Sequence, residues 1–344
     1  MYFDVAPKSK KEDFFNYEYQ YLDLKKAIER KEKIIAIKGV RRVGKTSLMS
    51  VVFNEIPKHK RIWIDGRILK DPQDDIIKMI SLFLSQKNNG IFGKIDSVNF
   101  SALGLGFKLN LKEGILEFEN LLKKSEHLHI FIDEAQRTDG KKLSNFISYC
   151  YDRFSNISFI ISGSEVGLIN EILGLDDSEH SLFGRNIYSI DMKRLDNNKG
   201  FEFLSHGFRE LKIKISDDEL FPVLNELGGL IGWLAMFGYN FAVVKKKNAL
   251  RETINMAVKI SASEILHFLS KKRNPKLYKE IIKYADNKNW SELKFICEKS
   301  LRKKLNDNSF NTAVNELEKH SFIEKRNSAY FSCDPLFTKA IFTL

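Results

Sequence analysis

The residues Gly39-Val40-Arg41-Arg42-Val43-Gly44-Lys45-Thr46 form a complete G-x-x-x-x-G-K-[ST] phosphate loop. The loop follows the apolar run 34–37, which is typical of a buried parallel strand, and precedes residues 47–53, whose apolar spacing predicts a helix. Glycines let backbone N–H groups face the phosphates, and the helix N-terminus adds a favourable dipole. Lys45 is placed to neutralise the outer phosphates and the Thr46 hydroxyl to ligand Mg²⁺. A chance glycine-rich turn rarely has this context, so residues 39–47, Ser47 included, are predicted to bind a nucleoside triphosphate.

A second apolar run, 129–132, ends in the carboxylate pair Asp133-Glu134. Ligands bind at the C-terminal ends of strands in open α/β sheets, so we expect Asp133 to hold the Mg²⁺ shell. Glu134 can point into the γ-phosphate space, where it would orient the attacking water or accept its proton. The alternatives are an ordinary strand-end acid for Asp133 and a solvent-facing acid for Glu134.

Polar residues also follow a third apolar run, 157–161. A hydroxyl of Ser162 or Ser164 at the end of this strand would sense the γ-phosphate or the attacking water. The alternative is that either serine caps the helix that begins near Glu165. The sequence favours neither interpretation, and Ser162 is the candidate for a catalytic role.

Three arginines are candidates for contact with phosphate or with neighbouring domains. Arg185 precedes the apolar run 187–190, and its planar guanidinium suits the charge that develops on a γ-phosphate, although a lone arginine is usually a surface ion-pairing group. Arg41 and Arg42 lie inside the phosphate loop, whose backbone faces the phosphates. Their side chains should therefore point outward and dock the loop against neighbouring acids or domains.

Apolar runs that alternate with helical segments decide the fold class of the first part of the chain; they lie at 34–37, 61–65, 129–133, 157–161 and 187–190. The alternation predicts an α/β domain with a parallel sheet covered on both faces. Residues 100–111 alternate apolar and polar side chains around two glycines, which predicts a hairpin or an irregular insertion.

The composition is that of a globular protein with more than one domain. The 344 residues suggest about two domains, and 43% hydrophobic residues are enough to give each a core. No run approaches the ~18 consecutive apolar residues of a membrane helix, and residues 1–11 are too charged for a secretory segment, so we expect a cytoplasmic protein without membrane contact. Cys150, Cys297 and Cys333 are widely spaced and should be buried, reduced thiols.

Positive charge is concentrated in the last part of the chain. Of the net charge of +11, residues 271–344 hold sixteen Lys and Arg against nine Asp and Glu. An acidic partner, with nucleic acid as the first candidate, and a solvated basic surface explain this charge equally well. The same residues show three helical pieces and two short strands around a turn, at 277–285, 291–301, 309–320, 322–324 and 330–332. This pattern predicts a winged helix-turn-helix domain.

Residues 196–247 have the apolar stripes of helices, with a break at Gly228-Gly229. Upstream of the phosphate loop stand Asp13-Phe14-Phe15 and Glu18, and the Walker B region reads D-E-A-Q at 133–136. The remaining matches are 161–168, Leu182-Phe183-Gly184-Arg185 and Gly228-Gly229-Leu230-Ile231-Gly232-Trp233-Leu234. Together these elements span nearly the whole chain, and it resembles an archaeal ATPase family of the STAND branch of AAA-related P-loop NTPases.

This resemblance implies an α/β ATP-binding domain, a small helical lid and a C-terminal winged helix, with a slow ATPase acting as a switch. It implies that Phe15 and Glu18 lie near the adenine and that Arg185 approaches the triphosphate or contacts the lid. Two positions depart from the family's pattern: Tyr17 replaces an arginine of F-F-x-R-E, and Ile231 replaces the proline of G-G-x-P-G-W-L.

The sequence thus predicts an α/β P-loop NTPase sheet of the AAA type over residues 1–193, a helical lid over 194–270 and a winged helix over 271–344. The main functional hypothesis is a Mg²⁺-dependent, ATP-hydrolysing switch with an unidentified protein partner; ADP is its product. The alternative is an ATP-responsive regulator that binds DNA through the winged helix, with Arg302-Lys303-Lys304 near the backbone. A binder without turnover is a third hypothesis, against which Glu134 argues. The catalytic candidates are Lys45, Glu134, Ser162 and Arg185, and the metal candidates are Thr46 and Asp133.

Overall fold

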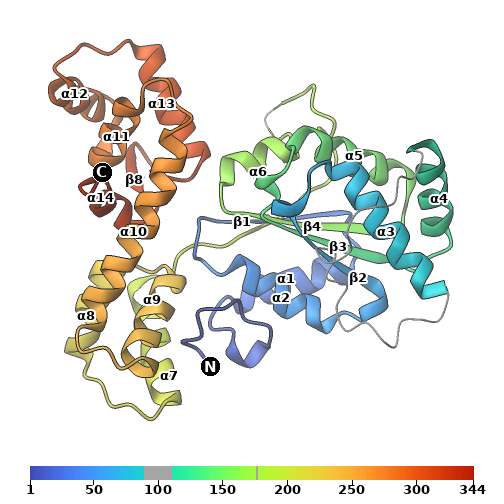
Figure 1. The fold of residues 1–344 in the computed structure, drawn as a ribbon, viewed down its shortest axis with the longest axis horizontal. Helices are drawn as coiled ribbons and strands as arrows, with labels where there is room; N and C mark the ends of the chain where they lie inside the picture. The colour runs from blue at the N-terminus through green and yellow to red at the C-terminus, as the bar shows by residue number, and fades with distance from the viewer. Residues whose placement is uncertain (89–110, 176) are drawn as a thin grey trace.

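The computed structural model describes residues 1–88, 111–175 and 177–344. A sheet of five parallel strands, in the order β2-β3-β4-β1-β5, forms the centre of the first part of the chain (Figure 1). The strands are β1 (Ile34–Lys38), β2 (Arg61–Asp65), β3 (Leu128–Asp133), β4 (Ile157–Gly163) and β5 (Tyr188–Asp191). Each lies within two residues of the run that predicted it, so the α/β fold class is confirmed.

Alternate side chains of each strand enter different cores because successive Cβ atoms point to opposite faces of a sheet. Ile35 and Ile37 pack in one core with α1 (Glu18–Glu29) and α2 (Lys45–Glu55). Ile34 and Ala36 pack in the other core. That second face is covered by α3 (Pro72–Asn88), α4 (Leu111–Lys123), α5 (Gly140–Arg153) and α6 (Val166–Leu173) (Figure 1). Both faces are therefore buried, which is why the strands read as continuous apolar runs.

Short 3-10 helices stand at several turns of this domain: η1 (Lys11–Asp13), η2 (Lys58–Lys60), η3 (Gly66–Ile68) and η5 (Ala135–Arg137). The expected hairpin at 100–111 falls almost entirely on residues outside the described ranges, and Leu111 begins α4. The three cysteines are free and buried, as predicted. None of the helices in the described part of the chain is long and apolar enough to cross a membrane.

A group of helices follows the sheet: α7 (Asn197–Glu210), α8 (Asp217–Leu227), α9 (Ile231–Gly238) and the π-helix η6 (Tyr239–Val243). The predicted break at Gly228-Gly229 separates α8 from α9. A Cβ on Gly229 would collide with the carbonyl oxygen of Leu195, so only glycine fits at this position. These four helices, which we call the lid, share one hydrophobic core with α1, α2 and the first face of the sheet.

The C-terminal part is a winged helix, as predicted, built from α11 (Pro275–Tyr284), α12 (Trp290–Leu301), α13 (Asp307–Lys319) and α14 (Pro335–Ile341). Its three-stranded sheet has the order β6-β8-β7, with β6 (Lys288–Asn289), β7 (Ile323–Arg326) and β8 (Ala329–Ser332). The long helix α10 (Ala249–Leu269) joins lid and winged helix (Figure 1). Ala257 of α10 packs in the lid core and Ile265 in the winged-helix core. One continuous helix therefore connects the two.

Candidate nucleotide site

The phosphate loop connects β1 to α2 and contains backbone conformations that favour glycine. Gly39 and Gly44 have φ values of +155° and +96°, and a Cβ on Gly39 would collide with the carbonyl oxygen of Met192. Lys45 is 6% exposed, and its Nζ donates to the carbonyls of Gly39 and Val40, both at 2.8 Å. The lysine therefore bridges its own loop at the place where a phosphate would bind.

Asp133 lies at the carboxyl end of β3, beside Thr46 and Ser162. The Thr46 hydroxyl donates to Oδ2 of Asp133 at 2.9 Å, and the Ser162 hydroxyl donates to Oδ1. The structure thus brings together three of the residues singled out in the sequence. Ser162 is fully buried and orients the carboxylate; it does not cap α6, whose N-cap residue is Glu165.

Glu134 follows Asp133 in the left-handed backbone region, at φ +53°, which turns its side chain away from the strand. Gln136 donates from Nε2 to Glu134 at 2.7 Å and to the Ser164 hydroxyl at 3.0 Å. A carboxylate held by an amide in this way is fixed in orientation at the mouth of the site. Gln136 belongs to the D-E-A-Q stretch, but the sequence pattern predicted no role for it.

A pocket of about 220 Å³ lies over the phosphate loop. Phe15 lines it, as expected, with its ring 5.4 Å from that of Phe203 in α7. Glu18 does not: its side chain is 66% exposed and pairs with Lys11 at 2.5 Å. Residue 18 begins α1 with its side chain in solvent, and its expected place near the adenine stays a prediction.

The N-terminal segment is a wall of this pocket that the sequence reasoning missed. Tyr2 and Lys8 line the pocket, and the backbone N–H of Lys8 donates to the Ser47 hydroxyl at 3.0 Å. The rings of Tyr2 and Phe15 pack edge to face, with their centres 5.9 Å apart. The aromatic pair Tyr2-Phe3 was the available signal, since a free terminal tail rarely carries two large aromatic side chains.

Arg41 and Arg42 leave the phosphate loop and contact other parts of the molecule, as predicted. Arg42 donates to Glu264 of α10 and, at 3.3 Å, to Asp334 at the N-cap of α14. Its guanidinium lies 4.0 Å from the centre of the Trp233 ring in α9, and Trp233 also donates to Asp334 at 2.9 Å. Burial raises the pKa of Asp334, and Arg42 opposes this shift. One loop arginine therefore joins the lid and the winged helix to the nucleotide site.

Arg41 makes a second such connection through Glu165. Its guanidinium donates to Glu165 at 2.7 Å, and Nδ1 of His320, at the end of α13, contacts the other oxygen of the same carboxylate. Nη2 of Arg137 lies 3.7 Å from Oε1 of Glu165. Burial disfavours ionisation of Glu165, but His320, Arg41 and Arg137 outweigh it, so the pKa of this carboxyl is lowered. We call the contact of Arg41, Glu165 and His320 the interdomain triad.

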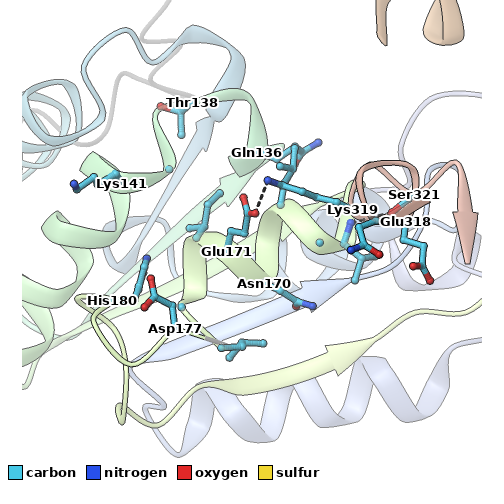
Figure 2. Close-up of a pocket in the computed structure, with 18 of the residues that line it drawn as sticks. Gln136, Thr138, Lys141, Asn170, Glu171, Asp177, His180, Glu318, Lys319 and Ser321 are labelled. Carbon is cyan, nitrogen blue, oxygen red and sulfur yellow. Dashed lines mark hydrogen bonds and ion pairs between the residues drawn. The ribbon is translucent and has the colours of Figure 1, made fainter. Parts of the chain in front are cut away.

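Next to the interdomain triad, the winged helix docks on α6 and leaves a groove of about 1290 Å³ (Figure 2). Lys319 of α13 pairs with Glu171 of α6, and the Ser321 hydroxyl accepts the N–H of Val166 at 3.0 Å. A Cβ on Gly167 would lie 2.5 Å from Cα of Lys319, so the two helices touch backbone to backbone. Acids outnumber lysines among the charged residues that line the groove, and Asp177 and Glu318 are among them (Figure 2).

Arg185 lies far from this arrangement. It donates to Asp152 at 2.6 and 3.2 Å and stands before β5, at the amino edge of the sheet, whereas the phosphate loop lies at the carboxyl edge. The expectation that Arg185 approaches the triphosphate is therefore not met within this chain. An arginine that precedes a parallel strand must lie at the edge opposite to the ligands.

The donor set fits Mg²⁺ with a triphosphate. The Thr46 hydroxyl and the Asp133 carboxylate are neighbouring hard oxygen donors, the kind that Mg²⁺ prefers, and they would hold the ion beside the phosphates. The pocket alone is smaller than the ~300–1,000 Å³ typical of ligand sites. It adjoins a second hollow of about 590 Å³, and both are lined by Arg41, Arg42, Glu134 and Ser164.

The parallel sheet, the phosphate loop and the paired Walker B carboxylates define a P-loop ATPase. The chain belongs to the family described as the ATPase domain predominantly from Archaea, whose model matches residues 14–237. In overall structure it is similar to the Walker-type ATPase PABY2304 of Pyrococcus abyssi, with 27% identity, a TM-score of 0.80 and coverage of 99% of this chain and 100% of that one. Residues 271–333 match the C-terminal winged helix-turn-helix domain of MCM proteins.

Two less similar structures also match. One is the RuvB Holliday junction branch migration motor of Thermotoga maritima, with 14% identity over 96% of both chains and a TM-score of 0.46. The other is the replication initiator DnaA bound to AMPPCP and single-stranded DNA, with 16% identity over 92% of this chain and 93% of that one and a TM-score of 0.47. A search of curated protein sequences found no match.

We predict that nucleotide affinity falls as the pH rises above 8. Burial lowers the pKa of Lys45 to about 8, although Glu134 and Asp133 oppose this shift. Bound phosphates favour the charged ammonium, so its pKa is higher in the complex, and affinity should drop by up to about tenfold per pH unit between the two values. Titration of the protein with ATP between pH 7 and 9.5 measures this effect.

Two variants test the assignment of this dependence to Lys45. Lys45→Arg keeps its charge throughout this range, so its affinity should not change with pH. Lys45→Ala should lose tight nucleotide binding at every pH. Equal affinity of the parent protein at pH 7 and 9.5, or normal binding by Lys45→Ala, would contradict the role given to Lys45.

Proposed function

We propose that this chain hydrolyses ATP with Mg²⁺ and acts as a nucleotide-dependent switch of the STAND type. The observation that carries hydrolysis is the pair Asp133 and Glu134, in which the first carboxylate is bonded to Thr46 and the second is held separately by Gln136. A chain that only bound ATP would not need a second oriented carboxylate at the γ-phosphate end. The family match to ATPase domains supports the same proposal.

Each side chain has a distinct task in this mechanism. The backbone N–H groups of residues 39–47 and the Lys45 ammonium hold the phosphates. Thr46 and Asp133 would hold Mg²⁺, which would neutralise charge on the phosphates, and Ser162 keeps the carboxylate in place. Glu134, oriented by Gln136, positions the attacking water and accepts its proton.

The switch follows from the bonds that Lys45 makes in this structure. Its ammonium bonds the carbonyls of Gly39 and Val40, and a bound phosphate would compete for it. Val40 packs against both the first core and the winged-helix core, so a change in the loop reaches the winged helix directly. We infer that ATP binding moves this part of the loop and with it Arg41, which weakens the interdomain triad.

The lid takes part in this movement although Ile231 replaces the expected proline. The Gly232 N–H donates to the Arg42 carbonyl at 3.0 Å, and Ile231 lines the nucleotide pocket. We place the domain divisions at 1–193, 194–270 and 271–344, because β5 ends at Asp191 and α10 ends at Leu269. We expect turnover to be slow, because each cycle must break and remake these interdomain bonds.

A second candidate function is DNA binding by the winged helix. Arg302, Lys303 and Lys304 are exposed in the turn before α13, and Asn308, Asn311 and Thr312 are exposed on α13 itself. Lys319, farther along α13, pairs with α6 beside the groove. A duplex could therefore reach the whole helix only after the winged helix has left α6. An unidentified protein partner is the other candidate for the released surface.

We expect Glu134→Gln to bind MgATP like the parent protein and to hydrolyse it roughly 10²-fold more slowly or worse, the usual scale for a lost general base. Steady-state phosphate release and equilibrium titration measure the two effects. Glu18→Gln is the matched control, because Glu18 is exposed and is not among the residues that line the pocket; it should change neither. Turnover of Glu134→Gln at the parent rate would make Glu134 a structural acid.

We expect Glu165→Gln to open the interface between α6 and α13 without nucleotide. Neutralising Glu165 removes the shared carboxylate partner of Arg41, Arg137 and His320, which should lower the opening free energy by up to about 3 kcal/mol. Amide hydrogen exchange of residues 166–173 reports the opening, since the Val166 N–H is bonded to Ser321.

The matched control for this experiment is Glu171→Gln, which removes only the exposed pair with Lys319 and should change exchange little. MgATP added to the hydrolysis-deficient Glu134→Gln protein should increase exchange at the same amides. If neither MgATP nor the Glu165→Gln substitution changes the exchange rates of these amides, the switch is refuted. The proposal of hydrolysis would not be affected.

We expect replacement of Arg302, Lys303 and Lys304 by alanine to weaken duplex binding for all sequences, if the winged helix binds DNA. The slope of log affinity against log salt should fall by up to about 0.9 for each phosphate that the variant can no longer neutralise. Fluorescence anisotropy with a labelled duplex, with and without MgATP, measures both. A parent protein that binds no duplex in either nucleotide state would exclude the DNA function.

A further inference from the structure

The hollow that adjoins the nucleotide pocket is surrounded by arginines. It is lined by four arginines, two acids and a serine: Arg41, Arg42, Arg67, Arg137, Glu134, Glu264 and Ser164. Because Glu134 lines both this hollow and the nucleotide pocket, the γ-phosphate of an ATP bound in the pocket would face this hollow. The charge that develops on the γ-phosphate during hydrolysis needs a cation there, and Arg185, the arginine expected from the sequence, is at the opposite edge of the sheet.

The turn that carries Arg67 is held against the Walker B turn. β2 pairs with β3 in a register that puts Asp65 beside Asp133. At the next residue, a Cβ on Gly66 would lie 2.5 Å from the carbonyl oxygen of Glu134, so only glycine lets the two turns come this close. The backbone of Arg67 is thereby held beside the Walker B turn, although it is distant from that turn in sequence.

Arg67 differs from the other arginines of the hollow in what it contacts. Arg41 and Arg42 are engaged with the carboxylates that hold the domains together, and Arg137 lies beside Glu165. Arg67 pairs with Asp65 of its own turn through Nε and Nη2, and among the described residues its Nη1 has no hydrogen-bond partner. Its side chain is 67% exposed. An exposed ion pair of this kind contributes little, so Arg67 can turn toward a phosphate at low cost.

The electrostatics agree with this placement. The pKa of Arg67 is raised, mainly by Asp65 and to a smaller extent by Glu134 and Asp133. The guanidinium is therefore close enough to both Walker B carboxylates for their charges to raise its pKa. A planar fork beside them could bind two oxygens of a γ-phosphate through parallel N–H bonds, a fixed geometry that an ammonium group lacks.

We propose that Arg67 is the arginine of this chain that contacts the γ-phosphate, so that it distinguishes ATP from ADP and stabilises the charge formed during hydrolysis. This inference rests on the proposed ATPase function and adds a residue to its site. Arg67 would act within its own chain, without an arginine from a second copy.

The test compares Arg67→Ala, Arg67→Lys and the matched control Arg185→Ala, which also removes an arginine paired to one aspartate. Two quantities are measured for each full-length protein: the ratio of the affinities for MgAMPPNP and MgADP, and the rate of a single turnover of ATP. Arg67→Ala should keep its affinity for ADP, lose about tenfold or more of its preference for the triphosphate, and slow turnover by roughly 10²-fold. Arg67→Lys should recover part of both, and Arg185→Ala should resemble the parent.

The two measurements separate this inference from the proposed function. A parent that prefers the triphosphate but does not hydrolyse ATP would refute hydrolysis, and the affinity ratio would still decide the role of Arg67. An unchanged ratio in Arg67→Ala would overturn the inference while hydrolysis stands. The inference would also be overturned if Arg137→Ala lost the preference for the triphosphate while Arg67→Ala kept it. A loss of ADP affinity equal to the loss for the triphosphate would also overturn it, because it would show a general effect on the fold.

Discussion

The parallel alignment of β1, β3 and β4 is the constraint on which the rest of this structure depends. It places the ends of three strands at one edge, so that Thr46, Asp133 and Ser162 meet although they come from three separate segments. Both oxygens of the Asp133 carboxylate are thereby bonded before any ligand arrives. A site prepared in this way needs little reorganisation when charge is added to it.

The phosphate loop of this protein acts on two sides at once. Its backbone and Lys45 form the proposed phosphate site, while the side chains of Arg41 and Arg42 contact the lid, α10 and the winged helix. Glu165 and Asp334 are buried acids that would be costly to leave without these partners. The positions of the domains are therefore coupled to the conformation of one short loop, which is the physical basis for proposing a switch.

The sequence predicted the residues of this site where a local pattern specifies their geometry. Lys45, Thr46 and Asp133 lie as expected, because a phosphate loop and a strand-end carboxylate are defined by the strands that they follow. Arg185 does not reach the site and Glu18 does not line the pocket; each is a single residue outside such a pattern. Arg185 precedes its strand and so lies at the wrong edge, and Glu18 begins a helix with its side chain in solvent.

The sequence by itself determined the class of fold, because five apolar runs alternating with helices and one glycine-lysine loop leave a parallel sheet as the way to bury both faces. It also predicted that the side chains of Arg41 and Arg42 contact acids of neighbouring segments. Only the tertiary structure decided which acids receive them, that residues 1–8 cover the pocket, and that Arg67 stands beside Glu134. These contacts join segments far apart in the chain, and they depend on strand order and on close backbone approaches such as that at Gly66, which no local pattern of residues encodes.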